Sequence, residues 1–435
     1  MNPFKFSSIF AFIPISYAVL FLPQSVIGIF YLGGNAAYDL LKIFLLGLVA
    51  YFIAYQVIKN FHLKNCRINF GVTSLSNKNV FTTTTIIFAF YFFVLVYAVL
   101  TSNKVPLWVA LCDGTSLEIA ESREMLFHSR MGWEKILIYL YSVLTSVLIP
   151  YFLMLCFLNR SRLAWPLYVA FYLSLLIPME KALFIKAFLP FFLLAANGYF
   201  SKRALYAAPL VAMIFLLSMS YLARGSDGGA SQGTLAISLD RMSPAQLNQS
   251  VNLIQNGRYL TLKDHVEKYY PLRGTTAVGS LLNRVLWIPY VTAYDWVQYF
   301  QQELGGAHTG GLTSALVSKL MGKEKIPMEQ LIFGYQFGLG PTQTAGANTN
   351  FMVDGYVNFG VIGVILMSSL VGFFIATIEN SNNSAACACI YLFLFQLLGG
   401  GFLGTFLGGG LLLFLLLIYF FRPNISCIKS PSILK

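Results

Sequence analysis

The segment NTNFMVDGYVNFG, residues 348–360, joins the longest polar part of the chain to an apolar run that extends to about residue 378. Asp354 lies near the start of that run. An ionisable side chain in an apolar segment of membrane-span length is costly, and such residues commonly mark functional sites. Residues 224–350 are polar, whereas nearly everything before and after them is apolar. The segment therefore separates a long N-terminal membrane region and a polar region from a shorter C-terminal membrane region.

The composition identifies the class of protein. The chain is 57% hydrophobic and 11% charged, and its mean hydropathy is +0.68. A soluble domain has about 25% charged residues, so we expect an integral membrane protein. The net charge is +12, but many basic residues fall in short loops, where they set the orientation of the spans. This composition argues against a nucleic-acid-binding protein.

A transmembrane helix needs about 20 apolar residues. We therefore predict an all-α polytopic membrane protein with about ten (10–12) transmembrane helices and one large external, periplasmic loop region. The expected spans are residues 8–31, 38–58, 82–101, 134–158, 164–178, 183–198, 204–222, 351–378, 385–401 and 404–421.

The spans divide the chain into four parts: an N-terminal bundle of about seven spans (1–222), the polar region (223–350), the C-terminal helices (351–421) and a tail (422–435). Basic loops such as 59–81 are expected to be cytoplasmic, which places the polar region outside and the tail inside. Within the polar region, residues 281–300 are expected to form an interfacial or re-entrant helix pair rather than another span. Residues 117–131 are expected to form an amphipathic helix on the same surface.

Arginines in the polar region are candidates for anion binding. Arg224, Arg273 and Arg284 are the three that we select, and Arg224 and Arg284 lie where loop meets membrane. A guanidinium group at this depth can bind a diphosphate with two hydrogen bonds. The alternative is contact with lipid phosphates, which many juxtamembrane arginines make.

Asp354 is the sharpest catalytic candidate. Residues 351, 354, 358 and 361 share one face of a helix, so Asp354 and Asn358 should lie together, with Asn350 at the helix mouth. The carboxylate could act as a general base or a sugar-orienting acceptor, or it could simply stabilise the helix N-terminus. His308 is a second candidate base, although a lone loop histidine is more often just solvated. The four histidines are too scattered to predict a metal site.

The pattern Asn-x-x-x-Asp-Gly-Tyr-x-Asn-Phe-Gly-x-x-Gly at residues 350–363, together with many spans and an arginine-rich external region, resembles bacterial O-antigen polymerases of the Wzy type. The clearest match covers residues 348–363, with a looser likeness at 284–300 and at the Arg224 junction. Some members carry paired Arg-x10-Gly motifs. None of the arginines of the polar region here has a glycine at that spacing.

This resemblance implies an inner-membrane glycosyltransferase with its active face in the periplasm. It would transfer a growing glycan from undecaprenyl diphosphate onto a new undecaprenyl-diphosphate-linked repeat unit. Arg224, Arg273 and Arg284 would bind diphosphate, and Asp354, with His308 in reserve, would act on the acceptor hydroxyl. The side chains of Asn350, Tyr356 and Asn358 would orient sugars.

No cofactor, metal ion or nucleic acid is expected in this reaction. The expected partners are the lipid-linked glycans, membrane lipids and a chain-length regulator protein. Two alternatives remain open: an O-antigen ligase that transfers glycan to the lipid A core, and a non-enzymatic translocator of lipid-linked glycans.

Overall fold

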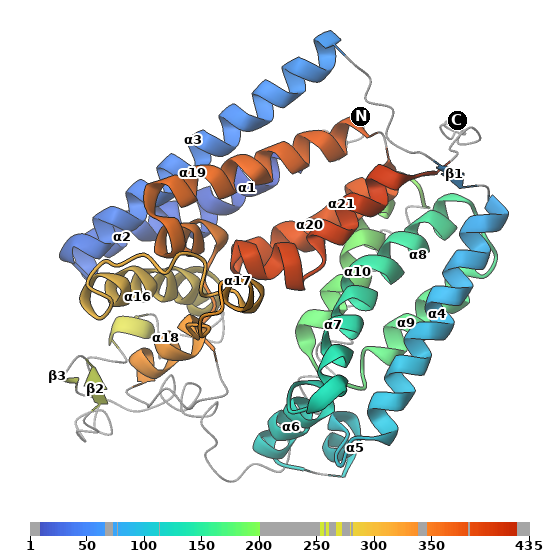
Figure 1. Cartoon of the computed structure of the whole chain (residues 1–435), viewed down its shortest axis with the longest axis horizontal. Helices are drawn as coiled ribbons and strands as arrows, with labels where there is room; N and C mark the ends of the chain where they lie inside the picture. The colour runs from blue at the N-terminus through green and yellow to red at the C-terminus, as the bar shows by residue number, and fades with distance from the viewer. Residues whose placement is uncertain are drawn as a thin grey trace.

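In the computed structural model (Figure 1), the chain is described over residues 9–65, 73–75, 77–112, 114–200, 253–255, 258–260, 267–271, 279, 282–337, 346–381 and 383–423. The N-terminal helices are α1 (Ile9–Leu20), α2 (Leu22–Tyr31), α3 (Gly34–Asn65), α4 (Asn77–Leu100), α5 (Pro106–Leu111), α6 (Ser116–Arg123), α7 (Ile136–Val143), α8 (Ile149–Leu158), α9 (Ala164–Ser174) and α10 (Lys181–Ala196). The C-terminal helices are α16 (Ile288–Gln302), α17 (Ala315–Leu320), α18 (Met328–Phe337), α19 (Phe351–Asn380), α20 (Ser384–Leu398) and α21 (Leu411–Phe420). The predicted span 204–222 and the candidates Arg224 and Arg273 lie outside the described residues.

Five helical segments of the described chain are long and apolar enough to cross a membrane. They are Ile9–Tyr31, Gly34–Phe61, Asn79–Leu100, Gly132–Leu158 and Phe351–Asn380. Shorter apolar helices cover Ile185–Ala196, Ser384–Leu398 and Leu411–Phe420. The chain is therefore a helical membrane protein, as predicted. The count of about ten spans and the location of the polar region stay predictions.

Helices α3 and α19 lie side by side along most of their length (Figure 1). Glycines permit this close packing: a Cβ on Gly372 of α19 would lie 2.5 Å from the backbone oxygen of Tyr51 in α3. Small residues at such crossings let transmembrane helix backbones approach each other. At the far end of the pair, the Glu379 carboxylate accepts a hydrogen bond from the Tyr55 hydroxyl (2.5 Å) and one from the Phe10 backbone N–H (3.1 Å).

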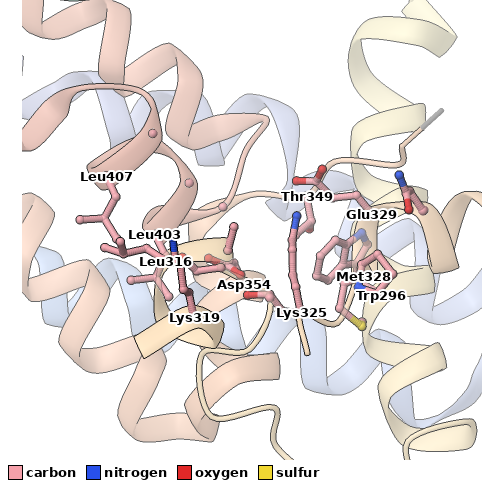
Figure 2. A pocket seen from close by; sticks show the side chains of 18 of the residues that line it. Trp296, Leu316, Lys319, Lys325, Met328, Glu329, Thr349, Asp354, Leu403 and Leu407 are labelled. Carbon is pink, nitrogen blue, oxygen red and sulfur yellow. The ribbon is translucent and has the colours of Figure 1, made fainter. Parts of the chain in front are cut away.

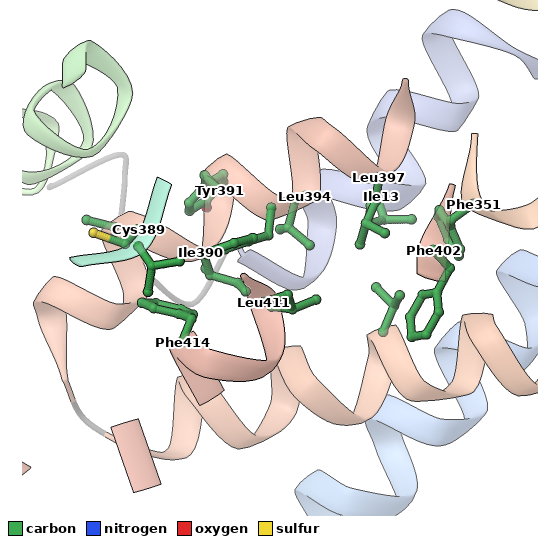
Figure 3. Close-up of a cluster of buried hydrophobic side chains, with 14 of the residues drawn as sticks. Ile13, Phe351, Cys389, Ile390, Tyr391, Leu394, Leu397, Phe402, Leu411 and Phe414 are labelled. Carbon is green, nitrogen blue, oxygen red and sulfur yellow. The ribbon is translucent and has the colours of Figure 1, made fainter. Parts of the chain in front are cut away.

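Helices α4 and α7 to α10 form a second group, and α20 and α21 lie between the two groups (Figure 1). A π-helical turn, Leu144–Leu148, joins α7 to α8. Figure 3 shows the apolar core around α20, in which Phe351 and Phe402 gather with Ile13 at one end. All three side chains are buried, so this core fixes both Phe351 and Phe402, which flank the acid at Asp354.

In the described part of the chain, four short strands pair in two places. Strand β1 (Thr73–Leu75) is parallel to β4 (Phe421–Pro423), and β2 (Leu253–Gln255) is antiparallel to β3 (Arg258–Leu260). The first pair brings the basic segment 59–81 next to the start of the C-terminal tail. Both were predicted to be cytoplasmic, and that placement stays a prediction.

The region predicted as an amphipathic helix, residues 117–131, is helical up to His128. It consists of α6, which begins at a capping box of Thr115 and Glu118, and a π-helical turn, Glu124–His128. After it, the buried Arg130 donates hydrogen bonds to the backbone oxygens of Ala98 (2.7 Å) and Leu126 (3.1 Å). A cation at the C-terminal end of α4 satisfies carbonyl groups that have no partner within the helix.

Residues 282–300, the described part of the uncertain segment 281–300, form one helical rod instead of the expected helix pair. A π-helical turn, Asn283–Trp287, runs directly into α16, because every junction residue keeps α-helical dihedral angles. Helix α16 packs against α3 and α19. The fully buried Asp295 carboxylate accepts hydrogen bonds from Lys268 (2.7 Å), Tyr269 (2.6 Å) and Gln336 (2.9 Å). Burial, followed by the charge of Asp295, raises the pKa of Tyr294 to about 12, so the Tyr294 hydroxyl stays protonated.

Candidate functional site

A break at Gly360 shapes the candidate site. The sequence predicts an unbroken helix over 351–378, but Gly360 has φ 65° and ψ −150°, which interrupts α19. Only glycine occupies this region of backbone space at low cost. The two halves touch each other, because a Cβ on Gly363 would collide with the backbone oxygen of Gly355. The expected continuation of one helix face to residue 361 is therefore wrong.

The break divides α19 into two parts with different surroundings. Residues 351–358 are buried apart from the half-buried Tyr356, whereas Val361 and Ile362 are 54% and 74% exposed, as expected for lipid-facing positions. The second half, residues 361–380, is 20 residues long, or about 30 Å, which matches the thickness of a bilayer core. The first half is thus a separate short helix within the protein, and it carries Asp354.

A loop of the polar region satisfies the carbonyl groups that the break leaves free. The backbone oxygen of Val357 accepts a hydrogen bond from the Thr309 N–H (3.2 Å), and that of Asn358 accepts one from the Gly310 N–H (2.9 Å). Buried carbonyl groups need such partners. The loop at 309–311 is therefore part of the structure that holds the short helix.

The Asn358 side chain, which is completely buried, connects this loop to Asp354. Its Oδ1 accepts hydrogen bonds from the Thr309 hydroxyl (2.6 Å), the Gly311 N–H (3.0 Å) and the Thr313 hydroxyl (3.1 Å). Its Nδ2 donates to Asp354 Oδ1 (2.8 Å) and to the Asp354 backbone oxygen (2.8 Å). The predicted pairing of Asp354 and Asn358 is confirmed. Because its amide group is fully engaged, Asn358 positions the carboxylate.

The Asp354 carboxylate also faces the start of the segment after α20. A Cβ on Gly401 would lie 2.8 Å from Asp354 Oδ2, and the backbone N–H groups of Phe402 and Leu403 interact with the carboxylate. Asp354 is 4% exposed. The glycine at 401 is required for this close approach, so the acid is held between two chain segments that are nearly 50 residues apart.

A cavity of about 660 Å³ opens beside Asp354 (Figure 2). This volume is within the range of small-molecule sites. Its charged lining side chains are Asp354, Lys319, Lys325 and Glu329. Lys319 lies in the last turn of α17, Lys325 lies in the loop that follows it, and Glu329 lies in the first turn of α18. The sequence interpretation missed these three residues, because they lie in a segment whose charges look like those of any solvated loop.

The other candidate residues surround the short helix without lining this cavity. Asn350 is the N-cap of α19: its Oδ1 accepts from the N–H groups of residues 352 and 353 and from the Tyr17 hydroxyl (3.1 Å). The His308 ring stacks on Phe300 at 5.1 Å, and the half-buried Tyr356 lies edge-on to both rings. Arg284 is exposed in the π-helical turn before α16. The structure thus brings only Asp354, of the described candidates, to the cavity.

A second cavity of about 440 Å³ lies on the other side of the π-helical turn Gly404–Gly408. Both cavities are lined by Gly404 and Gly408. Its polar lining includes Lys186 of α10, Asn348 and Gln396. The glycine-rich turn is therefore the wall between the two cavities.

Comparisons of the chain with models of protein families, with curated proteins and with solved structures found no match. The fold and the site define a helical membrane protein with a cavity built around a buried carboxylate at the mouth of a membrane helix.

Proposed function

We propose that this protein is a glycosyltransferase that polymerises undecaprenyl-diphosphate-linked oligosaccharide repeat units into O-antigen or a related surface polysaccharide. The reaction would take place at the periplasmic face of the bacterial inner membrane. The observation that carries the proposal is the cavity in which the oriented Asp354 carboxylate accompanies Lys319 and Lys325. Asp354 is also the acidic residue of the sequence motif at 350–363.

The proposed chemistry needs a base and a cation. The acceptor hydroxyl oxygen attacks the anomeric carbon of the donor glycan, and the bond between that carbon and the diphosphate oxygen breaks. The hydroxyl proton passes to the Asp354 carboxylate. The diphosphate leaves with the bonding electron pair, and the ammonium groups of Lys319 and Lys325 stabilise its charge. Neither step requires a metal ion or a nucleotide.

The lysines revise the predicted role of the arginines. Arg284 lies away from the cavity, and Arg224 and Arg273 lie outside the described residues. Lys319 and Lys325 are both exposed and both line the cavity that Asp354 faces. An ammonium group binds phosphate as a point charge, so two of them together suit a diphosphate. We therefore assign leaving-group stabilisation to Lys319 and Lys325.

Complementation of a polymerase-null strain tests this function. Asp354→Asn keeps the size of the side chain but removes its charge, and we expect a loss of polymer of about 10²–10⁴-fold, the contribution of a general base. Lys319→Met combined with Lys325→Met should shorten the polymer. Lys323→Met is the matched control, since Lys323 is exposed on the same loop but does not line the cavity.

The readout is the length distribution of lipopolysaccharide glycans on a gel, at equal membrane abundance of each variant. Loss of polymerase activity leaves lipid A core with single repeat units, whereas loss of ligase activity leaves lipid A core without any repeat unit. Normal long chains in the Asp354→Asn strain would exclude Asp354 as the base. An effect of Lys323→Met equal to that of the lysine pair would exclude the specific role of the cavity lysines.

A further inference from the structure

The two ends of the cavity beside Asp354 differ in chemistry (Figure 2). Leu316, Leu403 and Leu407 line one end, whereas Trp296, Glu329 and Thr349 line the other. Asp354 lies between these ends, with Lys319 beside Leu316 and Lys325 beside Thr349. The cavity therefore has an apolar end, charged groups along its length, and a second end where Glu329 and Thr349 lie beside Trp296 and Met328. A prenyl-diphosphate-linked sugar presents an apolar chain, a charged group and hydroxyl groups in a matching order.

Thr349 is the unusual residue at the polar end. Its side chain is 4% exposed, and its Oγ1 has no hydrogen-bond partner among the described residues, yet it lines the cavity. A buried hydroxyl without a partner is destabilising, and such groups in native proteins call for an explanation. A ligand hydroxyl would supply the missing partner once the Thr349 side chain turns its Oγ1 toward the cavity.

Two hydrogen bonds of Ala347 fix the segment that carries Thr349 near Glu329. The Ala347 N–H donates to the Glu329 backbone oxygen (2.8 Å), and the Ala347 backbone oxygen accepts from Trp296 Nε1 (2.8 Å). The segment that precedes α19 is thus tied to both α18 and α16. Glu329 is an exposed residue that lines the cavity, so its carboxylate can accept hydrogen bonds from a ligand.

We propose that Thr349 and Glu329 bind the sugar that is attached to the diphosphate of the lipid-linked substrate and select it by its hydroxyl groups. The Thr349 hydroxyl donates to or accepts from one sugar hydroxyl, and the Glu329 carboxylate accepts from a neighbouring one. The prenyl chain then points toward Leu316, Leu403 and Leu407, with the diphosphate at the lysines. The class of substrate rests on the proposed function, whereas the sugar-selecting role of Thr349 rests on the geometry.

Binding to the purified protein in detergent tests this inference without any polymerisation. The probes are farnesyl diphosphate and its conjugates with glucose, galactose or N-acetylglucosamine, measured by isothermal titration calorimetry. We expect the wild-type protein to bind at least one conjugate more tightly than farnesyl diphosphate. Thr349→Val, which replaces the hydroxyl with a methyl group of similar shape, should weaken that conjugate about 5–10-fold, the effect of one hydrogen bond. Its affinity for farnesyl diphosphate should not change.

Lys319→Met is the comparison variant, because it should lower the affinities for farnesyl diphosphate and for its conjugates by the same factor. The inference is overturned if no conjugate binds more tightly than farnesyl diphosphate, if Thr349→Val leaves the preference intact, or if it weakens all probes equally. Failure of the polymerase proposal is read separately, from normal glycan chains in the Asp354→Asn strain. If Thr349→Val loses the preference for the sugar conjugate, the role of Thr349 in sugar binding is supported even when the polymerase proposal fails.

Discussion

Replacing Gly360 with alanine would place a side chain at the break in α19. The backbone there has φ 65° and ψ −150°, a conformation that residues other than glycine rarely adopt. The added Cβ would also lie 2.8 Å from His308 Nε2 and 3.1 Å from His308 Cε1. The substitution therefore has two independent costs, one in the backbone and one in packing.

The expected destabilisation follows from these two costs. The backbone strain is about 1–3 kcal/mol, and the steric overlap adds about 1–3 kcal/mol, which gives about 2–6 kcal/mol in total. Unfolding entropy is about 2.1 cal/mol/K per residue, or about 0.9 kcal/mol/K for a chain of 435 residues. The Tm of Gly360→Ala should therefore fall by about 2–7 °C.

Heating purified protein in detergent and measuring the monodisperse fraction by size-exclusion chromatography gives the apparent Tm. All variants must be heated for the same time, since unfolding of such proteins is often irreversible. Two controls separate the costs. Gly306→Ala carries only the backbone cost, because Gly306 has φ +74° and open space around it. Gly399→Ala carries neither cost, because it has no positive φ and no atom within 4 Å.

The contact with His308 is tested by a double-mutant cycle. His308→Ala removes the ring that the new Cβ meets, so Gly360→Ala should cost less in that background than in the wild type by the steric part, about 1–3 kcal/mol. Equal costs in both backgrounds would refute the contact. Equal Tm values for the Gly360→Ala and Gly399→Ala variants would refute the break in α19 at Gly360.

Two further predictions concern buried polar groups. Asn358→Ala removes the Nδ2 donor to Asp354 and leaves the groups that donate to Asn358 Oδ1 without an acceptor. The Tm of this variant should fall, because each unpaired buried group costs about 1–3 kcal/mol. Glycan chains in the complemented strain should also be shorter. Asp295→Asn leaves Lys268, whose side chain is 17% exposed, without its counter-charge, and it should destabilise by about 3–5 kcal/mol. Adding Lys268→Met to Asp295→Asn should restore much of the Tm, and a double variant as unstable as Asp295→Asn would contradict the pairing.

Local relations in the site could be predicted from the sequence. The spacing of Asp354 and Asn358 by four residues predicts that they meet on one helix face, and they are hydrogen-bonded at 2.8 Å. The position of Asn350 at the helix mouth is that of an N-cap residue, and its side chain caps α19. Both relations depend only on helix geometry over one or two turns, which is why the sequence pattern was sufficient.

The break and the cavity depend on contacts between distant segments. Glycine is tolerated within membrane helices, so Gly360 alone does not predict a break. The free carbonyl groups of residues 357 and 358 find their partners in the loop at 309–310, which no local pattern indicates. The cavity lining comes from parts of the segments 313–330 and 401–408, together with Tyr139, Trp296, Thr349 and Asp354. Lys319 and Lys325 reach it only because α17 and α18 fold against the segment after α20.

Asp354 has surroundings that suit both an anchor and a base. It lies in the first turn of the short helix 351–359, and the N–H groups of Phe402 and Leu403 at the start of another helical segment also face it. Two helix N-termini stabilise the ionised carboxylate, which offsets part of its desolvation on burial. An anchor alone would not need a cavity with two lysines beside it. Asn358 holds the carboxylate on one side and the cavity borders it on the other, so its position is already fixed in the protein alone. In the proposed reaction, a base preorganised in this way would lower the barrier without reorganisation of the protein.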